Sequence, residues 1–207
     1  MTDAASRALA LRRGIYYEAL TVGWMFAEAI LAIGAGIAAR SVLLTAFGAD
    51  SVIELLSGAT LLWRLRVEET GGVDARIDTV ERRATWVSAM LLILLCAYVV
   101  LSAAAGLLLR IQPGRSWLGI AVAAAAVLAM PWLAARKRAA NETIQSPALR
   151  ADIAESVTCA YLAAVTLAGV LINALTGWWW FEYVGALALL IWLVPEAREA
   201  MDAARDA

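Results

Sequence analysis

The chain alternates between long apolar stretches and short clusters of charged residues. Six stretches are apolar over most of their length, and they cover residues 16–38, 42–63, 85–109, 117–135, 147–174 and 179–195. A hydrocarbon core of about 30 Å requires about 20 mostly apolar helical residues, which this pattern supplies six times. It predicts an all-α integral membrane protein with six transmembrane helices. We expect residues 1–207 to form one membrane domain, with no separate soluble domain.

The positions of the basic residues predict the orientation of these helices. If the N-terminus lies inside, only three of the 17 Lys and Arg residues fall in outside connections, namely Arg40, Arg110 and Arg115. The others fall at the two chain ends or in the inside connections, which include a solvated linker at 64–84 with Gly71 and Gly72, and the loop 136–146. The positive-inside rule then places both termini in the cytoplasm. The expected location is a bacterial cytoplasmic (inner) membrane.

Composition narrows the function classes. Hydrophobic residues make up 63% of the chain, charged residues 17%, and the mean hydropathy is +0.75, which argues against a soluble domain, a disordered chain or a nucleic-acid binder. The chain contains no histidine, the commonest metal ligand and proton relay near neutral pH. Its two cysteines, Cys96 and Cys159, have neither disulfide nor zinc-cluster spacing, and Cys96 reads as a packing residue.

Acidic residues occur where the bilayer disfavours them. Seven lie within or at the edge of the predicted helices: Glu18, Glu28, Asp50, Glu54, Asp152, Glu155 and Glu182. The others, Glu196 and Glu199 among them, are expected in loops or at helix ends. An acid at a helix centre costs about 2.5–3.5 kcal/mol on insertion, so several in one small bundle indicate a polar pathway.

The spacing of four of these positions favours a cation site. Asp50 and Glu54 are four residues apart, as are Glu155 and Cys159, so each pair shares one helix face. With Ser146 as helix cap, a rise of 1.5 Å per residue brings both pairs close to the bilayer midplane. Three carboxylates and a thiol there suit a divalent cation. The alternative is that the acids are protonated and bridge helices by hydrogen bonds, with Cys159 as a core residue.

The same segments resemble the cation diffusion facilitator family. Residues 41–57 (SVLLTAFGADSVIELLS) resemble its second helix, in which a His or Asp is followed four residues later by an Asp. Residues 148–159 (ALRADIAESVTC) resemble its fifth helix, with the pattern R-A-D-x-x-H-x-x-x-D. Residues 178–187 (WWWFEYVGAL) resemble the start of its sixth helix, which usually has Asp-Pro where Glu182 and Tyr183 stand.

The resemblance implies a function. By position it assigns Asp50, Glu54, Glu155 and Cys159 to the four metal-ligand places. Family members export zinc, iron, manganese, cobalt or cadmium, usually as homodimers that exchange metal for protons by alternating access. The implied partners are therefore a divalent metal cation, protons, the lipid bilayer and a second copy of the chain, with no resident cofactor and no nucleic acid. The 207 residues lack the family's cytoplasmic C-terminal domain, its His-rich loop and its H-P-x-G-H-type segment.

Two further acids and two rival functions stay open. Glu28 is either a polar group of the proton pathway or a residue hydrogen-bonded to a neighbouring helix, and Asp152 either attracts cations or pairs with Arg150.

An exporter of small organic solutes would need cationic groups in its cavity, whereas the mid-helix charges here are acidic. An intramembrane enzyme would need a histidine or a paired Glu-Glu motif to activate water. We therefore expect a transporter and not an enzyme.

Overall fold

The protein is an all-helical bundle. The computed structural model describes residues 2–69 and 77–206, and within these ranges it contains helices and no strand. The helices are α1 (Thr2–Ala39), α2 (Val42–Glu69), α3 (Ile77–Leu108), α4 (Trp117–Ile144), α5 (Pro147–Thr176) and α6 (Trp180–Asp206). Each has a segment long and apolar enough to cross a membrane, which confirms the predicted fold class. Gly71 and Gly72 of the expected linker lie outside the described residues.

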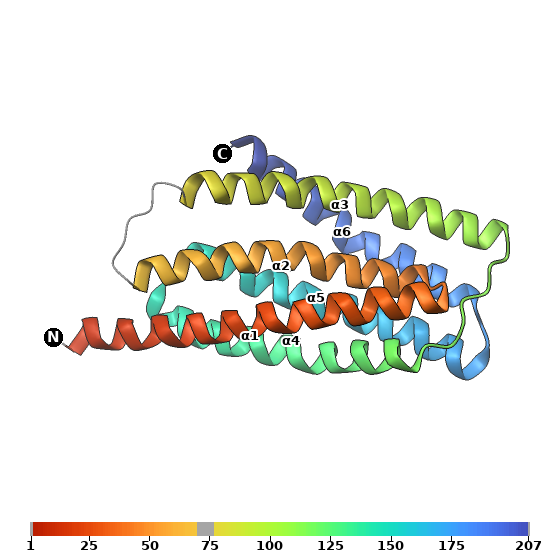
Figure 1. Ribbon diagram of the computed structural model, residues 1–207, viewed down its shortest axis with the longest axis horizontal. Helices are drawn as coiled ribbons and strands as arrows, with labels where there is room; N and C mark the ends of the chain where they lie inside the picture. The colour runs from red at the N-terminus through yellow and green to blue at the C-terminus, as the bar shows by residue number, and fades with distance from the viewer. Residues whose placement is uncertain (1, 70–76, 207) are drawn as a thin grey trace.

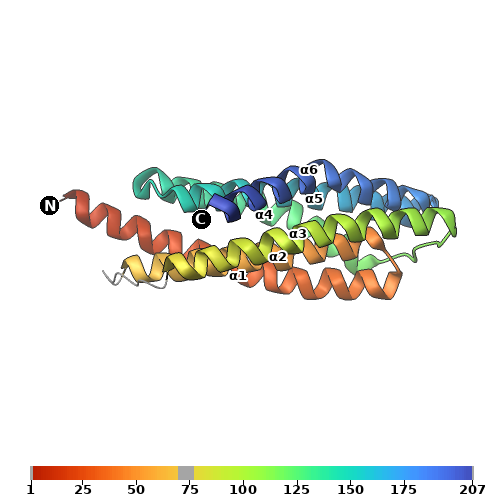
Figure 2. The same cartoon turned by 90° about the horizontal axis from the view of Figure 1, so that it is seen from above.

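The six helices run side by side, and both termini lie at the same end of the bundle (Figure 1). We call this the terminal end, and the opposite end, which holds the α1–α2, α3–α4 and α5–α6 connections, the far end. Figure 2 shows α1, α2 and α3 on one side of the bundle and α4, α5 and α6 on the other. Between the two sides α1 packs on α4, α3 on α6, and α2 on both α5 and α6. Helix α2 therefore packs against helices on both sides of the bundle.

Local sequence signals set several helix ends. Ser146 caps α5 by accepting a hydrogen bond from the backbone N–H of Leu149 at 3.3 Å, and Pro147 occupies the first helical position. The same helix ends at Gly177, whose φ of 73° is the left-handed conformation that glycine adopts without strain. The Ser146 cap and the start of α5 at residue 147 were predicted by the sequence and are confirmed.

Burial divides the bundle into a core and a lipid-facing surface. Phe47, Leu43 and Leu44 of α2 are fully buried at the centre of the main hydrophobic cluster. By contrast, α3 exposes large apolar side chains such as Leu94 and Leu101. Exposed apolar surface of this extent on a soluble monomer would be unfavourable, whereas against lipid it is favourable.

Small residues let α1 and α2 approach closely, which provides a stability prediction. A Cβ added at Gly48 would lie 2.7 Å from the backbone nitrogen of Ile33 on α1, whereas a Cβ at Gly34 would meet nothing within 4 Å. Gly48→Ala should therefore destabilise the protein by about 1–3 kcal/mol through overpacking. Gly34→Ala, the matched control, should be neutral or slightly stabilising because alanine favours the helix. Thermal unfolding in detergent compares the two, and equal stabilities would contradict the close contact.

Candidate metal centre

Helix α2 carries two buried carboxylates on one face. Asp50 is 2% exposed and Glu54 3% exposed, and their spacing of four residues directs both away from lipid. Neither oxygen of Asp50 has a hydrogen-bond partner, and Oε2 of Glu54 also has none. Buried polar atoms are almost always paired in proteins, so three unpaired carboxylate oxygens within two turns of one helix require an explanation.

Helix α5 faces these carboxylates with its own polar residues. Glu155 is hydrogen-bonded to Ser57 of α2, and its charge acts on both Asp50 and Glu54. Cys159 is 1% exposed and contacts the Glu54 carboxylate through its thiol. The fold thus turns the two predicted pairs toward each other across the α2–α5 contact.

The four predicted ligands are not drawn together around a common point. Among residues 2–69 and 77–206, no three Asp, Glu or Cys side chains approach closely enough to hold a metal ion jointly. The arrangement is a group of facing acids on two helices and not a formed metal site.

A cavity of about 670 Å³ leads from these acids toward the terminal end. Its walls come from α2, α3, α5 and α6, and they include Glu54, Asp152 and Glu155. Arg64 and Ala203, both close to the terminal end, line the same cavity. A hydrated ion at that end therefore has a polar route to Glu54 in the bundle interior.

Glu28 of α1 is held by hydrogen bonds from three residues. Trp24 Nε1 donates to its Oε2 at 2.5 Å, and Ser51 Oγ of α2 donates to its Oε1 at 2.7 Å. The Cys159 thiol lies 3.9 Å from the same Oε1. The Glu28 carboxylate thus links α1, α2 and α5 beside Asp50. It contacts the thiol of Cys159, which the sequence predicts to be a metal ligand.

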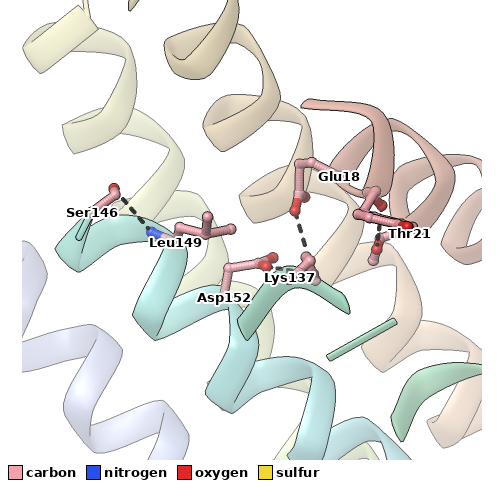
Figure 3. A network of polar contacts seen from close by, with 7 residues as sticks. Glu18, Thr21, Lys137, Ser146, Leu149 and Asp152 are labelled. Atoms are coloured by element: carbon pink, nitrogen blue, oxygen red, sulfur yellow. Dashed lines mark hydrogen bonds and ion pairs between the residues drawn. The ribbon is translucent and has the colours of Figure 1, made fainter. Parts of the chain in front are cut away.

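A fully buried ion-pair network lies beside the cavity (Figure 3). Lys137 of α4 is 0% exposed and donates to Asp152 of α5 and, at 3.3 Å, to Glu18 of α1. This corrects the expectation that Lys137 belongs to an inside loop, because α4 continues to Ile144. Asp152 was expected to pair with Arg150 if it paired at all, but its ion pair is with Lys137.

The signal for Lys137 was present in the helical periodicity. The buried face of α4 continues through Met130, Leu133, Ala134, Lys137, Ala140 and Ile144. These spacings of three and four residues are those of one helix face, so the buried stripe passes through the charged cluster. Sequence reasoning ended the helix at the charges and missed the lysine on the buried face.

A second network closes the far end. Glu182, expected near the membrane interface, is 2% exposed and accepts hydrogen bonds from Ser41, which directly precedes α2, and from Asn173 Nδ2 of α5, the latter at 2.6 Å. Asn173 also donates to the carbonyl of Pro113 at 3.2 Å. Beside it, the hydroxyl of Tyr183 donates to the carbonyl of Ile111 at 2.7 Å. These contacts tie α2, α5 and α6 to the α3–α4 connection.

Glu196 is the third charged residue that the sequence misplaced. It was expected beyond the last helix, but α6 continues through Pro195 to Asp206. Glu196 lines the cavity together with Glu54 and Glu155, and its buried Oε2 has no hydrogen-bond partner. Glu196 lies four residues after Trp192, which also lines the cavity, so both residues share one helix face. The predicted end of the last helix overlooked this spacing.

Within residues 2–69 and 77–206, six helices are long and apolar enough to cross a membrane, and α2, α3, α5 and α6 line a cavity with buried acids. This is the architecture of an integral membrane protein of the small-transporter class. The family model of the cation efflux transmembrane domain matches residues 20–202, so the chain belongs to the cation efflux family, the cation diffusion facilitators. This is a family of transporters and not of enzymes, and it supports a transported divalent cation as substrate. A comparison with curated proteins found no match.

Proposed function

We propose that this cation transporter exports a divalent metal cation by proton-coupled antiport, through a site near the bilayer midplane formed by Asp50, Glu54 and Glu155 with Cys159 beside them. The observation that carries the proposal is the pair of buried, unpaired oxygens on Asp50. Burying a charge without a partner is costly, and a bound cation or a proton removes that cost. Asp50 is thus suited to alternate between the two.

The conformation supports a direction for the alternating-access cycle. The cavity extends from Glu54 to the terminal end, whereas the Glu182 network closes the far end. If the terminal end is cytoplasmic, as the basic residues indicate, a cation enters from the cytoplasm. Release on the other side then requires the contacts of Glu182 with Ser41 and Asn173 to break while the cavity closes.

The proton carriers in this proposal are the carboxylates themselves. The chain has no histidine, so protons and metal compete for the same oxygen atoms of Asp50, Glu54 and Glu155. A cation displaces protons at the inward-facing site, and protons displace the cation when the site faces outward. Glu28, in contact with Cys159, is proposed as an accessory proton group, and Asp152 as the polar residue of the cavity wall that the cation passes.

The candidate cations are zinc, manganese, ferrous iron, cobalt and cadmium. We expect the protein to act as a homodimer in a bacterial inner membrane, with both termini in the cytoplasm. The exposed apolar face of α3, which includes Leu94 and Leu101, is available to lipid or to a second copy. Crosslinking in native membranes tests the dimer.

Reconstituted protein should carry at least one of these cations. With a cation-sensitive dye inside proteoliposomes, we expect uptake above that of protein-free vesicles, faster with an acidic interior and slowed by a protonophore. In detergent, a cation at 100 times its Kd should stabilise the protein by about 2.7 kcal/mol. The absence of both uptake and stabilisation for every cation would overturn the proposal. Stabilisation by organic solutes alone would instead favour the rival exporter.

A further inference from the structure

The cavity brings a carboxylate of α6 to the acids of α2 and α5. We propose that Glu196 is a cation-binding residue of this transport site, and that the resulting set of carboxylates selects a hard divalent cation of the manganese class. This inference rests on the proposed function, since it adds a ligand to the proposed site and names the class of its substrate.

The position of Glu196 follows from the cavity-lining face of α6. The residues of α6 on the cavity wall are Ile191, Trp192, Pro195, Glu196, Glu199, Ala200 and Ala203. Their spacing of three and four residues is that of one helix face, so Glu196 stands on the face turned toward α2 and α5. Glu54 of α2 and Glu155 of α5 line the same cavity.

Electrostatic contact and missing partners point to a ligand among these acids. The charge of Glu196 acts on Asp50, Glu54 and Glu155. Glu196 Oε2, Glu54 Oε2 and both oxygens of Asp50 are buried without a hydrogen-bond partner. Asp50 and Glu54 are less than one tenth exposed, so water cannot supply all the hydrogen bonds that their carboxylate oxygens lack. Unpaired carboxylate oxygens from α2 and α6 therefore lie within electrostatic range of one another.

The protein's own buried cation forms its ion pairs with other acids. Among the basic residues that the structure describes, Lys137 is the one that is fully buried, and it pairs with Glu18 and Asp152. Its ion pairs join α1, α4 and α5, whereas Glu196 belongs to α6. A mobile cation in the cavity is the species that would balance Asp50, Glu54 and Glu196 together.

The ligand chemistry favours a hard cation. Glu54, Glu155 and Glu196 offer carboxylate oxygens to the cavity. The thiol of Cys159 does not line the cavity, and it contacts the carboxylates of Glu28 and Glu54 instead. Oxygen ligands suit manganese-like and magnesium-like ions, whereas cadmium prefers thiolates. Because Glu196 adds a carboxylate to the cavity and the Cys159 thiol does not line it, the ligand set favours hard cations.

The test uses purified full-length protein and Mn²⁺ as the probe. Binding of Mn²⁺ is followed by the loss of the free-ion electron paramagnetic resonance signal, and transport by dye quenching in proteoliposomes. Glu196→Gln should weaken Mn²⁺ binding and raise the KM for transport at least tenfold, and Glu196→Asp should recover part of both. Asp202→Asn is the control, because Asp202 is an exposed acid of the same helix and is not among the residues that line the cavity.

The outcomes separate this inference from the proposed function. If Glu196→Gln binds Mn²⁺ as the unaltered protein does, Glu196 is not a ligand. If Cd²⁺ binds more tightly than Mn²⁺ and Cys159→Ser removes that preference, the assignment to a hard cation is wrong. In both cases the protein would still bind and carry a cation. If the unaltered protein binds no divalent cation, the proposed function itself fails.

Discussion

Asp50→Asn is expected to reduce divalent-cation transport at least tenfold while raising the thermal stability of the metal-free protein. The amide has nearly the same shape as the carboxylate but carries no charge. Because Asp50 makes no hydrogen bond through either buried oxygen, the substitution breaks no contact of the apo state. It replaces an ionisable group that is buried without a partner by a neutral one, which favours folding. Loss of one partner of a buried charge pair costs about 2–5 kcal/mol, which predicts the loss of binding.

Two measurements check this prediction together. Uptake into proteoliposomes reports transport, and thermal unfolding without and with cation reports stability. Asp202→Asn serves as control, because Asp202 is an exposed acid of α6 and should change neither quantity. Unchanged transport of every cation by the Asp50→Asn protein would remove Asp50 from the site. A parallel loss of transport and stability would instead assign Asp50 a structural role.

The fold and the shared helix face of each predicted pair could be predicted from the sequence because their signals are local. Six apolar stretches of membrane length predict six helices without knowledge of how they pack. The spacing of Asp50 and Glu54 fixes their shared helix face, and the Ser146–Pro147 pair fixes the start of α5. Each of these inferences depends on residues within a few turns of one helix.

The charged residues that the sequence misplaced depend on several helices at once. Lys137 and Glu196 both follow apolar stretches, and a charge there was interpreted as the end of the membrane segment. In the structure both helices continue, and the charge is accommodated by α1 and α5 in one case and by the cavity in the other. Glu182 likewise depends on Ser41 and Asn173, which are distant in sequence. Periodicity can place such a charge on a buried helix face, but the partners that stabilise it come from other helices.

The two ends of the bundle differ in how their charges are satisfied. At the far end Glu182 has hydrogen-bond donors, whereas both oxygens of Asp50 and Oε2 of Glu196 in the interior have none. In the proposed transport cycle, cation binding at these unpaired acids would offset the hydrogen bonds that are lost when the far end opens.

Lys137→Met is expected to destabilise the protein by about 3–5 kcal/mol, the largest stability effect that the structure predicts. Lys137 is the shared partner of Glu18 and Asp152, and all three side chains are almost completely shielded from solvent. Methionine matches the apolar stem of lysine but leaves both carboxylates without their cation. Removing one partner of a buried ion pair is costly because the remaining charge is uncompensated.

Matched variants separate the lost ion pairs from lost packing. Arg138→Met alters the neighbouring exposed cation and should change stability by no more than about 0.5 kcal/mol. The triple variant Glu18→Gln, Lys137→Met, Asp152→Asn removes all three charges and should regain much of the stability, since a neutral buried set has no uncompensated charge. Thermal unfolding in detergent measures each variant. If the triple variant is no more stable than Lys137→Met alone, the contribution of Lys137 is packing and not charge.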